Sequence, residues 1–339
     1  MSVQEILSAG TASQAPAGMV PLDHLTVIEA KGADAADFLQ SQLTQDVAKL
    51  DPDHACLAGY CTAKGRMLAS ALLWRARPDP ADPVPRLLLV VDAGLAAALQ
   101  KRLSMFVLRA KVKLAVTPLK VAGAWGGAET LQSAAGGPLP TTDWVRADLP
   151  SGSWIAAPRA DAGPARWWWI GDDGQLAALT QAAGIAHGGA DAWRAADIAA
   201  GIPWITAATQ DLFVPQMVNF ELIGGVSFTK GCYPGQEVVA RSHYLGKVKR
   251  RTFHGRLAQA DAQADAQALV AADVFQEGDE QPCGRIVNAA PDGDGVAILY
   301  ESTLAAGQGE LPLHAGSPIG PVIAPQALPY ALAGNNAQG

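Results

Sequence analysis

Apolar residues recur along the first half of the chain with two periods, and each period predicts a different kind of element. Residues 34–50 carry apolar side chains at helical spacing and end at an Asp–Pro pair, which predicts a helix. Residues 57–74 form two runs around a Lys–Gly turn and predict a β-hairpin, and the apolar run 86–92 predicts a buried strand. A helix over 95–106 and a strand over 111–116 follow. Helices mixed with hairpins favour an α+β fold over a purely parallel sheet.

Three adjacent tryptophans, Trp167 to Trp169, lie in a predicted strand that follows a stretch rich in Gly, Pro and Ala over 118–165. Successive side chains of a strand point to opposite faces, so the three cannot share one core. We expect at least one of them to face outward or to line a cleft, although plain packing is the more common role of tryptophan. Short helices are predicted over 175–184 and 191–200.

Beyond residue 250 the pattern changes to short strands separated by turns, which predicts a small C-terminal β-barrel or sandwich. Within it, the low-complexity segment 258–269 predicts a solvated loop. The expected organisation is a flexible lead-in over 1–20, an α+β region over 21–245, the barrel over 246–330 and a tail over 331–339.

Composition limits the classes of protein to which the chain can belong. Its 339 residues are 49% hydrophobic and 17% charged, which provides material for a core and gives no signature of disorder. The net charge of −7 argues against general coating of nucleic acid, although a local basic patch can still meet phosphates. The start lacks the features of a signal peptide, and no apolar run is long enough to cross a bilayer. Together with four scattered cysteines, these features indicate a reduced, cytoplasmic protein with no membrane partner.

One segment, residues 230–251, differs electrostatically from the rest of the chain. It holds six cations and one acid, a net charge of +5, which leaves −12 elsewhere. Near its start, Gly231 and Gly235 frame a tight turn that can present Cys232. Nearby cations favour the thiolate, the form that acts as a nucleophile or a metal ligand. From spacing alone, a buried small cysteine beside a turn is the more common arrangement.

The sequence gives weaker support to a metal site, to a bound iron–sulfur cluster and to ring stacking. Cys56 and Cys61 lie near His54, but further ligands at metal-site spacing are lacking, so we expect structural cysteines and no metal site. An iron–sulfur cluster usually takes four thiolates, so a cluster handled by this chain would share its ligands with a partner. Aromatic residues interleaved with the basic run suit stacking on a flat ring, and a solvated strand edge fits the same residues equally well.

A resemblance to a known family rests on the segment 201–241, "GIPWITAATQDLFVPQMVNFELIGGVSFTKGCYPGQEVVAR", and the following "YLGKVKRR". These residues resemble the signature of the YgfZ family of folate-binding proteins, for which the core "KGCYPGQE", Lys230 to Glu237, is highly specific. The segments "FLQSQLTQDV" and "YCTAKGRMLAS" fit the N-terminal half of that family, so the resemblance covers roughly residues 22–300. The family is implicated in iron–sulfur cluster assembly or repair and in tRNA modification.

The resemblance extends to the aminomethyltransferase T-proteins of glycine cleavage and therefore implies a fold. It implies a ring of α+β subdomains, the first two interleaved, around a central folate cleft that a small C-terminal β-barrel closes. It also implies that tetrahydrofolate, or a one-carbon derivative of it, is the cofactor. The cofactor contacts that it implies are Lys230, Gly231, Tyr233, Gly235, Gln236, Glu237, Arg241, Asp197, Gln216 and Asn219.

Two positions depart from the family pattern. The segment that matches "GRMLASALL" carries an acidic pair in the T-proteins, and here Ala69 and Ser70 stand in its place. Neither can act as a carboxylate acid or base, which argues against aminomethyl transfer. Many relatives have a glutamate that hydrogen-bonds the pterin where this chain has Ala199, and an unmatched buried donor costs about 1–3 kcal/mol. Asp197, two residues away, is the candidate replacement.

These features lead to one principal hypothesis and two alternatives. The chain is expected to be a folate-dependent accessory protein whose partners are iron–sulfur enzymes or assembly proteins, including enzymes that modify tRNA. In this hypothesis Cys232 contacts the cluster intermediate or forms a transient bond with a partner. The first alternative is a tetrahydrofolate-dependent one-carbon transferase or demethylase. The second is a tRNA-binding module, whose contacts would be Lys247, Lys249, Arg250 and Arg251.

Overall fold

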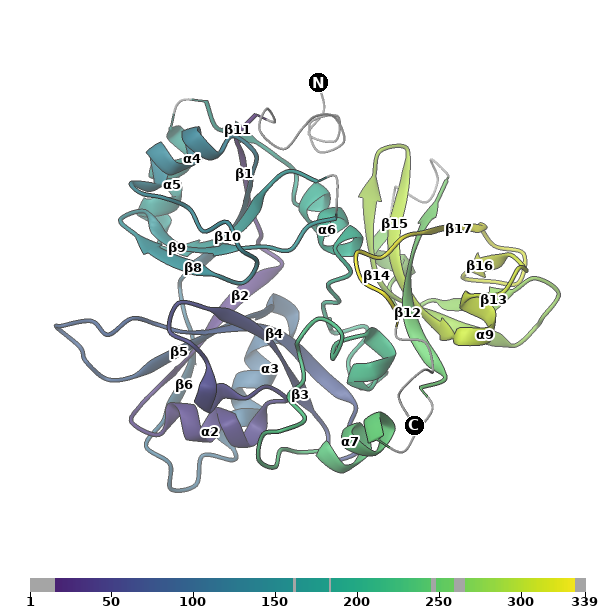
Figure 1. The fold of residues 1–339 in the computed structure, drawn as a ribbon, viewed down its shortest axis with the longest axis horizontal. Coiled ribbons are helices and arrows are strands. Elements are labelled where there is room, and N and C mark those ends of the chain that lie inside the picture. Colours follow the sequence, from purple (N-terminus) through teal and green to yellow (C-terminus); the bar gives the residue numbers. More distant parts are fainter. Residues whose placement is uncertain (1–15, 161–162, 183, 245–247, 259–265, 333–339) are drawn as a thin grey trace.

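The computed structural model describes residues 16–160, 163–182, 184–244, 248–258 and 266–332. Most of the predicted lead-in and of the predicted tail, part of the low-complexity segment, and Lys247 lie outside the described residues. The described chain forms three β-sheets, which Figure 1 shows in three separate regions of the molecule. No helix in the described part of the chain is long and apolar enough to cross a membrane.

The first sheet is antiparallel and has the order β3-β4-β5-β2-β6. The predicted hairpin is confirmed as β3 and β4, and the predicted buried strand is confirmed as β5. The predicted helix over 95–106 is present, shifted slightly toward the N-terminus, and packs on this sheet. The elements of this region are β2 (Leu25–Lys31), α2 (Ala35–Gln42), η1 (Val47–Lys49), β3 (Ala55–Cys61), β4 (Met67–Arg75), β5 (Arg86–Asp92), α3 (Ala93–Ser104) and β6 (Lys113–Val116).

The predicted helix over 34–50 is shorter in the structure, where it ends with α2. The chain then turns so that Leu43 forms a bridge to β3. Thr44 fixes this turn, because its hydroxyl accepts from the N–H of Gly59 at 2.7 Å and donates to the carbonyl of Gly225 at 2.6 Å. The helical spacing in the sequence runs on, but these tertiary hydrogen bonds override it.

The second sheet has the order β11-β1-β7-β10-β9-β8, with one parallel pair between β1 and β11. The chain begins in this sheet with β1, builds the whole first sheet, and returns with β7. The two regions are therefore interleaved, as the resemblance implies. The elements of this region are β1 (Gly18–Pro21), β7 (Lys120–Trp125), α4 (Ala128–Ala135), β8 (Arg146–Leu149), β9 (Gly152–Ala156), β10 (Arg166–Gly171), α5 (Asp173–Gln181), β11 (Ala186–His187) and α6 (Ala190–Ala199).

All three tryptophans of β10 are buried, so the expectation that one faces outward or lines a cleft is wrong. Trp168 belongs to the core shared with the first sheet and meets Trp193 of α6 edge-on, with ring centroids 6.0 Å apart. Trp167 and Trp169 belong to a second core together with residues of α4 and α5. The alternation argument holds, but both faces of this sheet are covered.

The third sheet has the order β16-β13-β14-β15-β12-β17, and a bridge between His314 and Val322 joins its two edges. The predicted C-terminal barrel is thus confirmed. Helix α6 packs against β14 and β15, which attaches the barrel to the second sheet (Figure 1). The elements are β12 (Arg250–Leu257), η3 (Ala266–Leu269), β13 (Asp273–Gln276), β14 (Pro282–Asp292), β15 (Gly295–Thr303), α9 (Leu304–Gly307), β16 (Leu313–Ala315) and β17 (Ile323–Gln326).

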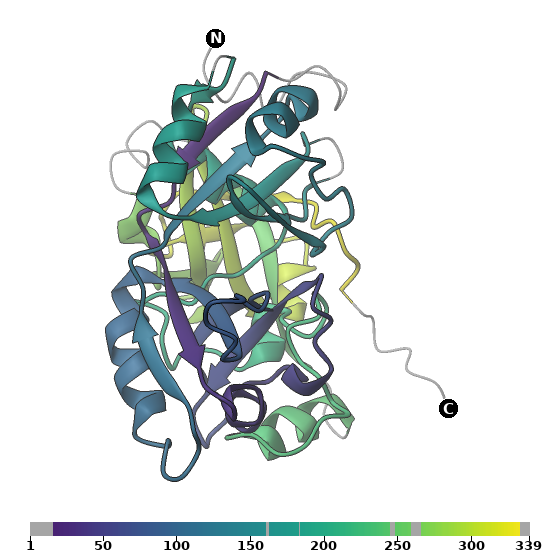
Figure 2. The same cartoon turned by 90° about the vertical axis from the view of Figure 1, so that its left-hand side faces the viewer.

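The segment between α6 and β12 carries the KGCYPGQE motif. It contains η2 (Pro215–Val218) and α7 (Gln236–Tyr244), and the sequence patterns did not predict α7. Figures 1 and 2 both place α7 at the end of the molecule that also carries α2, away from β1. The motif therefore lies beside the first sheet, although it follows the second sheet in the sequence.

Candidate functional site

The KGCYPGQE motif forms a turn that packs against the β3–β4 hairpin. Gly235 has a φ of +81°, and a Cβ on it would lie 2.4 Å from the carbonyl oxygen of Thr62 and 2.6 Å from the Cα of Gly65. Gly65 is also left-handed, with a φ of +74°, so two glycines meet backbone to backbone. This close approach fixes the position of the motif on the hairpin.

The ammonium group of Lys230 forms hydrogen bonds with backbone carbonyls inside the protein. Its Nζ donates to the carbonyl of Leu43 at 2.6 Å and to that of Gln40, at the C-terminal end of α2, where carbonyl groups lack helical partners. Nζ also lies 5.1 Å from the centroid of the Tyr233 ring. Because Lys230 is only 7% exposed, burial lowers its pKa to about 8. Lys230 therefore attaches the motif to α2.

Between these two fixed points, the turn exposes Cys232. The interpretation of Cys232 as a buried small residue is therefore wrong. Its neighbour Gly231 is exposed too, and a Cβ added there would meet nothing within 4 Å. Cys56 and Cys61 are structural cysteines, and burial raises the pKa of each to about 12. The motif thus presents one accessible thiol on a fixed turn.

The motif continues directly into α7, which begins at Gln236. Gln216 holds this helix in place, because its Nε2 donates to the carbonyl of Val239 at 2.6 Å. Glu237 and Arg241, on the same helix, are exposed. Two of the residues that the resemblance assigns to the cofactor are thus accessible beside the turn, while Gln216 is buried and positions the helix.

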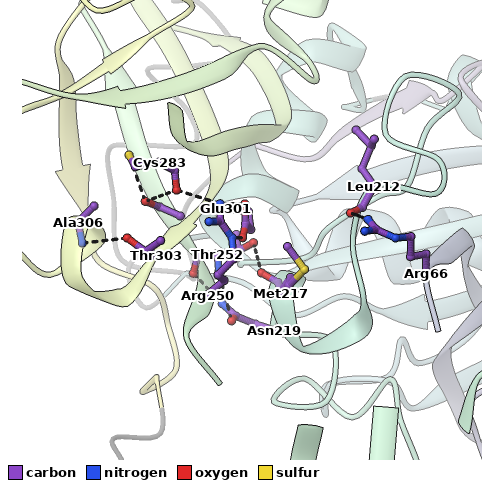
Figure 3. A network of polar contacts seen from close by, with 11 residues as sticks. Arg66, Leu212, Met217, Asn219, Arg250, Thr252, Cys283, Glu301, Thr303 and Ala306 are labelled. Carbon is purple, nitrogen blue, oxygen red and sulfur yellow. Dashed lines mark hydrogen bonds and ion pairs between the residues drawn. The ribbon is translucent and has the colours of Figure 1, made fainter. Parts of the chain in front are cut away.

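Asn219 connects the same region to the barrel. It is buried in a left-handed conformation with a φ of +57°, and its Nδ2 donates to the carbonyl of Thr252 on β12 at 2.7 Å. The hydroxyl of Thr252 donates to the carbonyl of Met217 at 2.9 Å, and Figure 3 shows these groups facing one another. Asn219 therefore holds β12 against η2, and its side chain has this partner inside the protein.

Arg250 and Arg251, at the end of the basic segment 230–251, are held in ion pairs within the protein. Arg250 forms a two-pronged pair with Glu301 of β15 (Figure 3), and Arg251 is buried against Glu221. Lys249 is exposed, and Lys247 lies outside the described residues. Of the described cations assigned to tRNA contact, Lys249 is therefore exposed, Arg250 is partly exposed but paired, and Arg251 is buried.

A second candidate site lies between the first sheet, α6 and the barrel, and we call it the junction cavity. Its volume is about 60 Å³, and it lies between α6, the end of the first sheet where β2 begins and β5 ends, and the barrel at η3 and β14. Polar side chains form much of its wall, whereas Ile198, Ile202 and Trp204 are apolar. The polar lining includes His24, Asp92, Arg194, Asp197, Thr206 and Asn288.

Asp197 lines this cavity, but both of its oxygens already have partners. Oδ1 accepts from Arg166 at 2.7 Å, and Oδ2 accepts from the indole N–H of Trp204 at 2.9 Å. Burial raises the pKa of Asp197, and the neighbouring Arg166 opposes that rise. The hydroxyl of Ser70 also has a partner within the protein, since its Oγ accepts from the N–H of Ile205 at 2.9 Å.

Two residues that sequence reasoning missed also face this cavity. Burial lowers the pKa of His24 to about 3, so the imidazole is neutral at pH 7, and its buried Nδ1 has no partner among the described residues. Burial raises the pKa of the Asp92 carboxyl. The pairing of Leu25 with Asp92 places His24 and Asp92 at the same end of strands β2 and β5. In the sequence, the position of Asp92 at the end of a predicted buried strand is the only feature that indicates a polar group at this cavity.

The contacts implied by the resemblance therefore fall in three places. Most lie on the turn and α7, Gln216 and Asn219 lie behind them toward the barrel, and Asp197 lies in the junction cavity. The structure thus offers two kinds of site: a displayed thiol and an enclosed polar cavity.

Comparison with known proteins identifies relatives along most of the chain. It is 28% identical to the tRNA-modifying protein YgfZ of Colwellia psychrerythraea over 321 residues, which cover 93% of each chain. It is 29% identical to the protein of that name from Sodalis glossinidius over 332 residues, 94% of this chain and 95% of the relative. The protein of that name from Edwardsiella ictaluri is 34% identical over 252 residues, 71% and 72% of the two chains. No family model matches the chain.

Among solved structures, the chain resembles the glycine cleavage system aminomethyltransferase T of Bartonella henselae, with a TM-score of 0.73. The match covers 94% of this chain and 87% of that one at 15% sequence identity, so it bears on the fold alone. It confirms the predicted α+β fold of the T-protein type with its C-terminal barrel.

Proposed function

Because the chain belongs to the family of tRNA-modifying YgfZ proteins, we propose that it is an accessory protein that supports iron–sulfur enzymes, including tRNA-modifying ones, through Cys232. The observation that supports this most strongly is the way in which the Cys232 turn is held. Buried contacts of Lys230 and Gly235 fix it on both sides, while the thiol between them stays exposed. A turn built in this way positions one side chain for a partner.

The surroundings of Cys232 favour a transient role. In the described part of the chain, no group of three or more His, Cys, Asp and Glu side chains is placed to hold a metal ion. One thiolate alone does not retain an iron–sulfur cluster, which usually takes four. In this proposal the cluster is therefore cargo: it stays bound to the partner, and Cys232 supplies one thiolate to iron during assembly or repair.

The finer part of the proposal is that a folate binds at the junction cavity. The pterin ring carries N–H donors, and the carboxylate of Asp92 and the unpartnered Nδ1 of His24 are groups there that suit them. Asp197 does not suit this role, because Arg166 and Trp204 occupy its oxygens. When bound, a folate would supply one-carbon chemistry. The cavity of about 60 Å³ is smaller than a typical ligand pocket, so binding requires the junction to widen.

The geometry gives less support to a one-carbon transferase. Ala69 and Ser70 are buried, and the hydroxyl of Ser70 accepts a backbone hydrogen bond rather than facing a substrate. No carboxylate stands at either position to act as acid or base. Substrate-dependent formation of methylene-tetrahydrofolate by the purified protein would overturn this assessment.

The experiment that tests the proposal replaces Cys232 by Ser in a strain that lacks its own copy of the gene. The expected result is loss of the modified tRNA nucleosides that depend on iron–sulfur enzymes, with an unchanged melting temperature of the purified variant. Cys283→Ser is the matched control, since Cys283 is half-buried in the barrel, where its Sγ receives a hydrogen bond from Ser302. Full modification with Cys232→Ser would contradict the proposal.

Folate binding is tested separately by calorimetric titration with tetrahydrofolate. We expect binding by the natural protein, at least tenfold weaker binding by Asp92→Asn, and little change on Asp37→Asn, an exposed carboxylate on α2. No binding by the natural protein, restored by Ala199→Glu, would mean that this chain has lost the pterin contact of its relatives. In that case the role of Cys232 would not involve folate.

A further inference from the structure

Exposed cations gather at the end of α3, in the connection from α3 to β6, and at the start of β6. No acidic residue occurs between Asp92 and Glu129, whereas six cations do. Five of them fall within residues 101–113, which we call the basic loop, in a chain whose net charge is −7. They are Lys101, Arg102, Arg109, Lys111 and Lys113, and all five are exposed.

The five cations of the basic loop lack charged partners in the described part of the chain. None of the five side chains forms an ion pair or a hydrogen bond with a residue that the structure describes. The carboxylate of Asp34 contacts the backbone of this loop, since its Oδ2 accepts from the N–H of Lys111 at 2.6 Å. This contrasts with Arg250 and Arg251, which are neutralised by Glu301 and Glu221. The charge of the loop is therefore not neutralised by residues that the structure describes.

Apolar side chains stand exposed among these cations. Met105 is 63% exposed, Phe106 48% and Leu108 87%, and the three lie within four consecutive residues. Single exposed apolar residues are common on protein surfaces, but an exposed group rimmed by charges marks an interaction site. Phe106 offers a ring face for stacking, and its neighbours can pack beside it.

The loop is held in place at both of its ends. Leu103 and Leu114 are buried in the core. Gln100 connects α3 to β6, because its Nε2 donates to the carbonyl of Leu114 at 2.9 Å. Short-range backbone hydrogen bonds, such as Phe106 N–H to the carbonyl of Leu103 at 3.0 Å, shape the turn after α3. The exposed side chains therefore project from a fixed backbone.

We propose that the basic loop docks RNA, with its cations on phosphates and Phe106 stacked on an unpaired base. Cations that neutralise phosphates supply most of the affinity of such surfaces, and an aromatic ring stacks on any base. Both views of the molecule place this connection at the end that carries α2 and α7, the end at which the Cys232 turn lies (Figures 1 and 2). The choice of tRNA as ligand rests on the proposed function, since the curated relatives are named tRNA-modifying proteins.

The test is fluorescence anisotropy with labelled bulk tRNA and the full chain, over a series of salt concentrations. Replacing Arg102, Arg109 and Lys111 by Gln should weaken binding by about tenfold or more and reduce the slope of log K against log salt by about 2. Phe106→Ser should weaken binding by about 5- to 150-fold, the range expected for one stacked base, without changing that slope. Circular dichroism verifies that each variant is folded.

The matched control replaces three exposed cations elsewhere, Lys49, Lys64 and Arg159, by Gln and changes the net charge equally. This control should leave affinity within about twofold, and an equal loss in the control would overturn the proposal in favour of a diffuse charge effect. No binding of tRNA by the natural protein would also overturn it, as would binding to phosphatidylglycerol vesicles alone. Cys232→Ser should bind tRNA normally, so a failure of the thiol hypothesis and a failure of RNA docking give different results.

Discussion

The Cys232 turn and the junction cavity both contain residues that one resemblance assigns to a cofactor, yet these residues are used in opposite ways. At the turn, Lys230 and Gly235 use their contacts to hold the backbone, and the thiol remains free. At the cavity, Asp197 uses both of its carboxylate oxygens on neighbours within the protein, Arg166 and Trp204. The difference teaches that membership of a motif does not distinguish a residue that meets a ligand from one that supports it.

The largest expected effect concerns the buried pair of Asp197 and Arg166. Asp197→Ala leaves an unpaired guanidinium in the interior and should lower the free energy of unfolding by about 3–5 kcal/mol. The control on the same helix is Asp191→Ala, which removes a more exposed pair with Arg194 and should cost about 0.2–1 kcal/mol. Urea denaturation measures both. A stable Asp197→Ala protein that no longer binds tetrahydrofolate would make Asp197 a ligand-binding residue instead.

The next effect is a difference in stability between alanine substitutions at the two glycines of the motif, Gly235 and Gly231. Gly235→Ala places a side chain on a left-handed backbone and drives it into the hairpin, so it should cost about 1–3 kcal/mol from the conformation alone, with the collision added. Gly231→Ala meets open space and should change stability by less than about 0.5 kcal/mol. Thermal unfolding of the two variants decides whether the turn is fixed at Gly235. Equal stability of the two would show that it is not.

Lys230→Met removes the donor from the end of α2 and should destabilise the protein by about 1–3 kcal/mol. The variant also predicts a pH effect. The pKa of Lys230 is about 8 when folded and 10.5 ordinarily, so between these values the unfolded chain binds more protons. The stability of the natural protein should therefore rise with pH from about 8 to about 10.5, relative to Lys230→Met. Parallel pH profiles for the two proteins would mean that Lys230 is not buried as described.

The smallest expected effect is that of Cys232→Ser on stability. The side chain is exposed, so the free energy of unfolding should stay within about 0.5 kcal/mol of the natural value. Cys61→Ser, which places a hydroxyl in the core, should cost about 1–3 kcal/mol unless it finds a partner. Urea titrations of the two variants measure this contrast. A large destabilisation by Cys232→Ser would assign the thiol a structural role.

Much of the architecture was predictable from the sequence, because local patterns determine it. The hairpin over 57–74, the strand over 86–92 and the C-terminal barrel follow from apolar runs and turn residues. Helix α7 was missed because only Val239 is buried within it, which leaves no apolar stripe to recognise. The burial of all three tryptophans of β10 depends on helices that cover both faces of the sheet.

The candidate site was predictable only in part. The glycines around Cys232 indicated a displaying turn, and the structure has that turn. The partner of Lys230 lies 187 residues away in the sequence, so no local pattern identifies the lysine as a cap of α2. His24 and Asp92 meet through strand pairing, and the two oxygens of Asp197 are taken by residues on different elements. Such assignments follow from tertiary packing.

The central claim is that the turn exists to present the thiol of Cys232 to a partner. The most direct measurement alkylates the native protein with iodoacetamide, maps the modified cysteines by mass spectrometry, and follows the support that the protein gives to iron–sulfur enzymes in an extract lacking it. The account predicts that Cys232 reacts before the other three cysteines and that support falls in proportion to its modification. Full support by a protein whose Cys232 is completely alkylated would contradict the account.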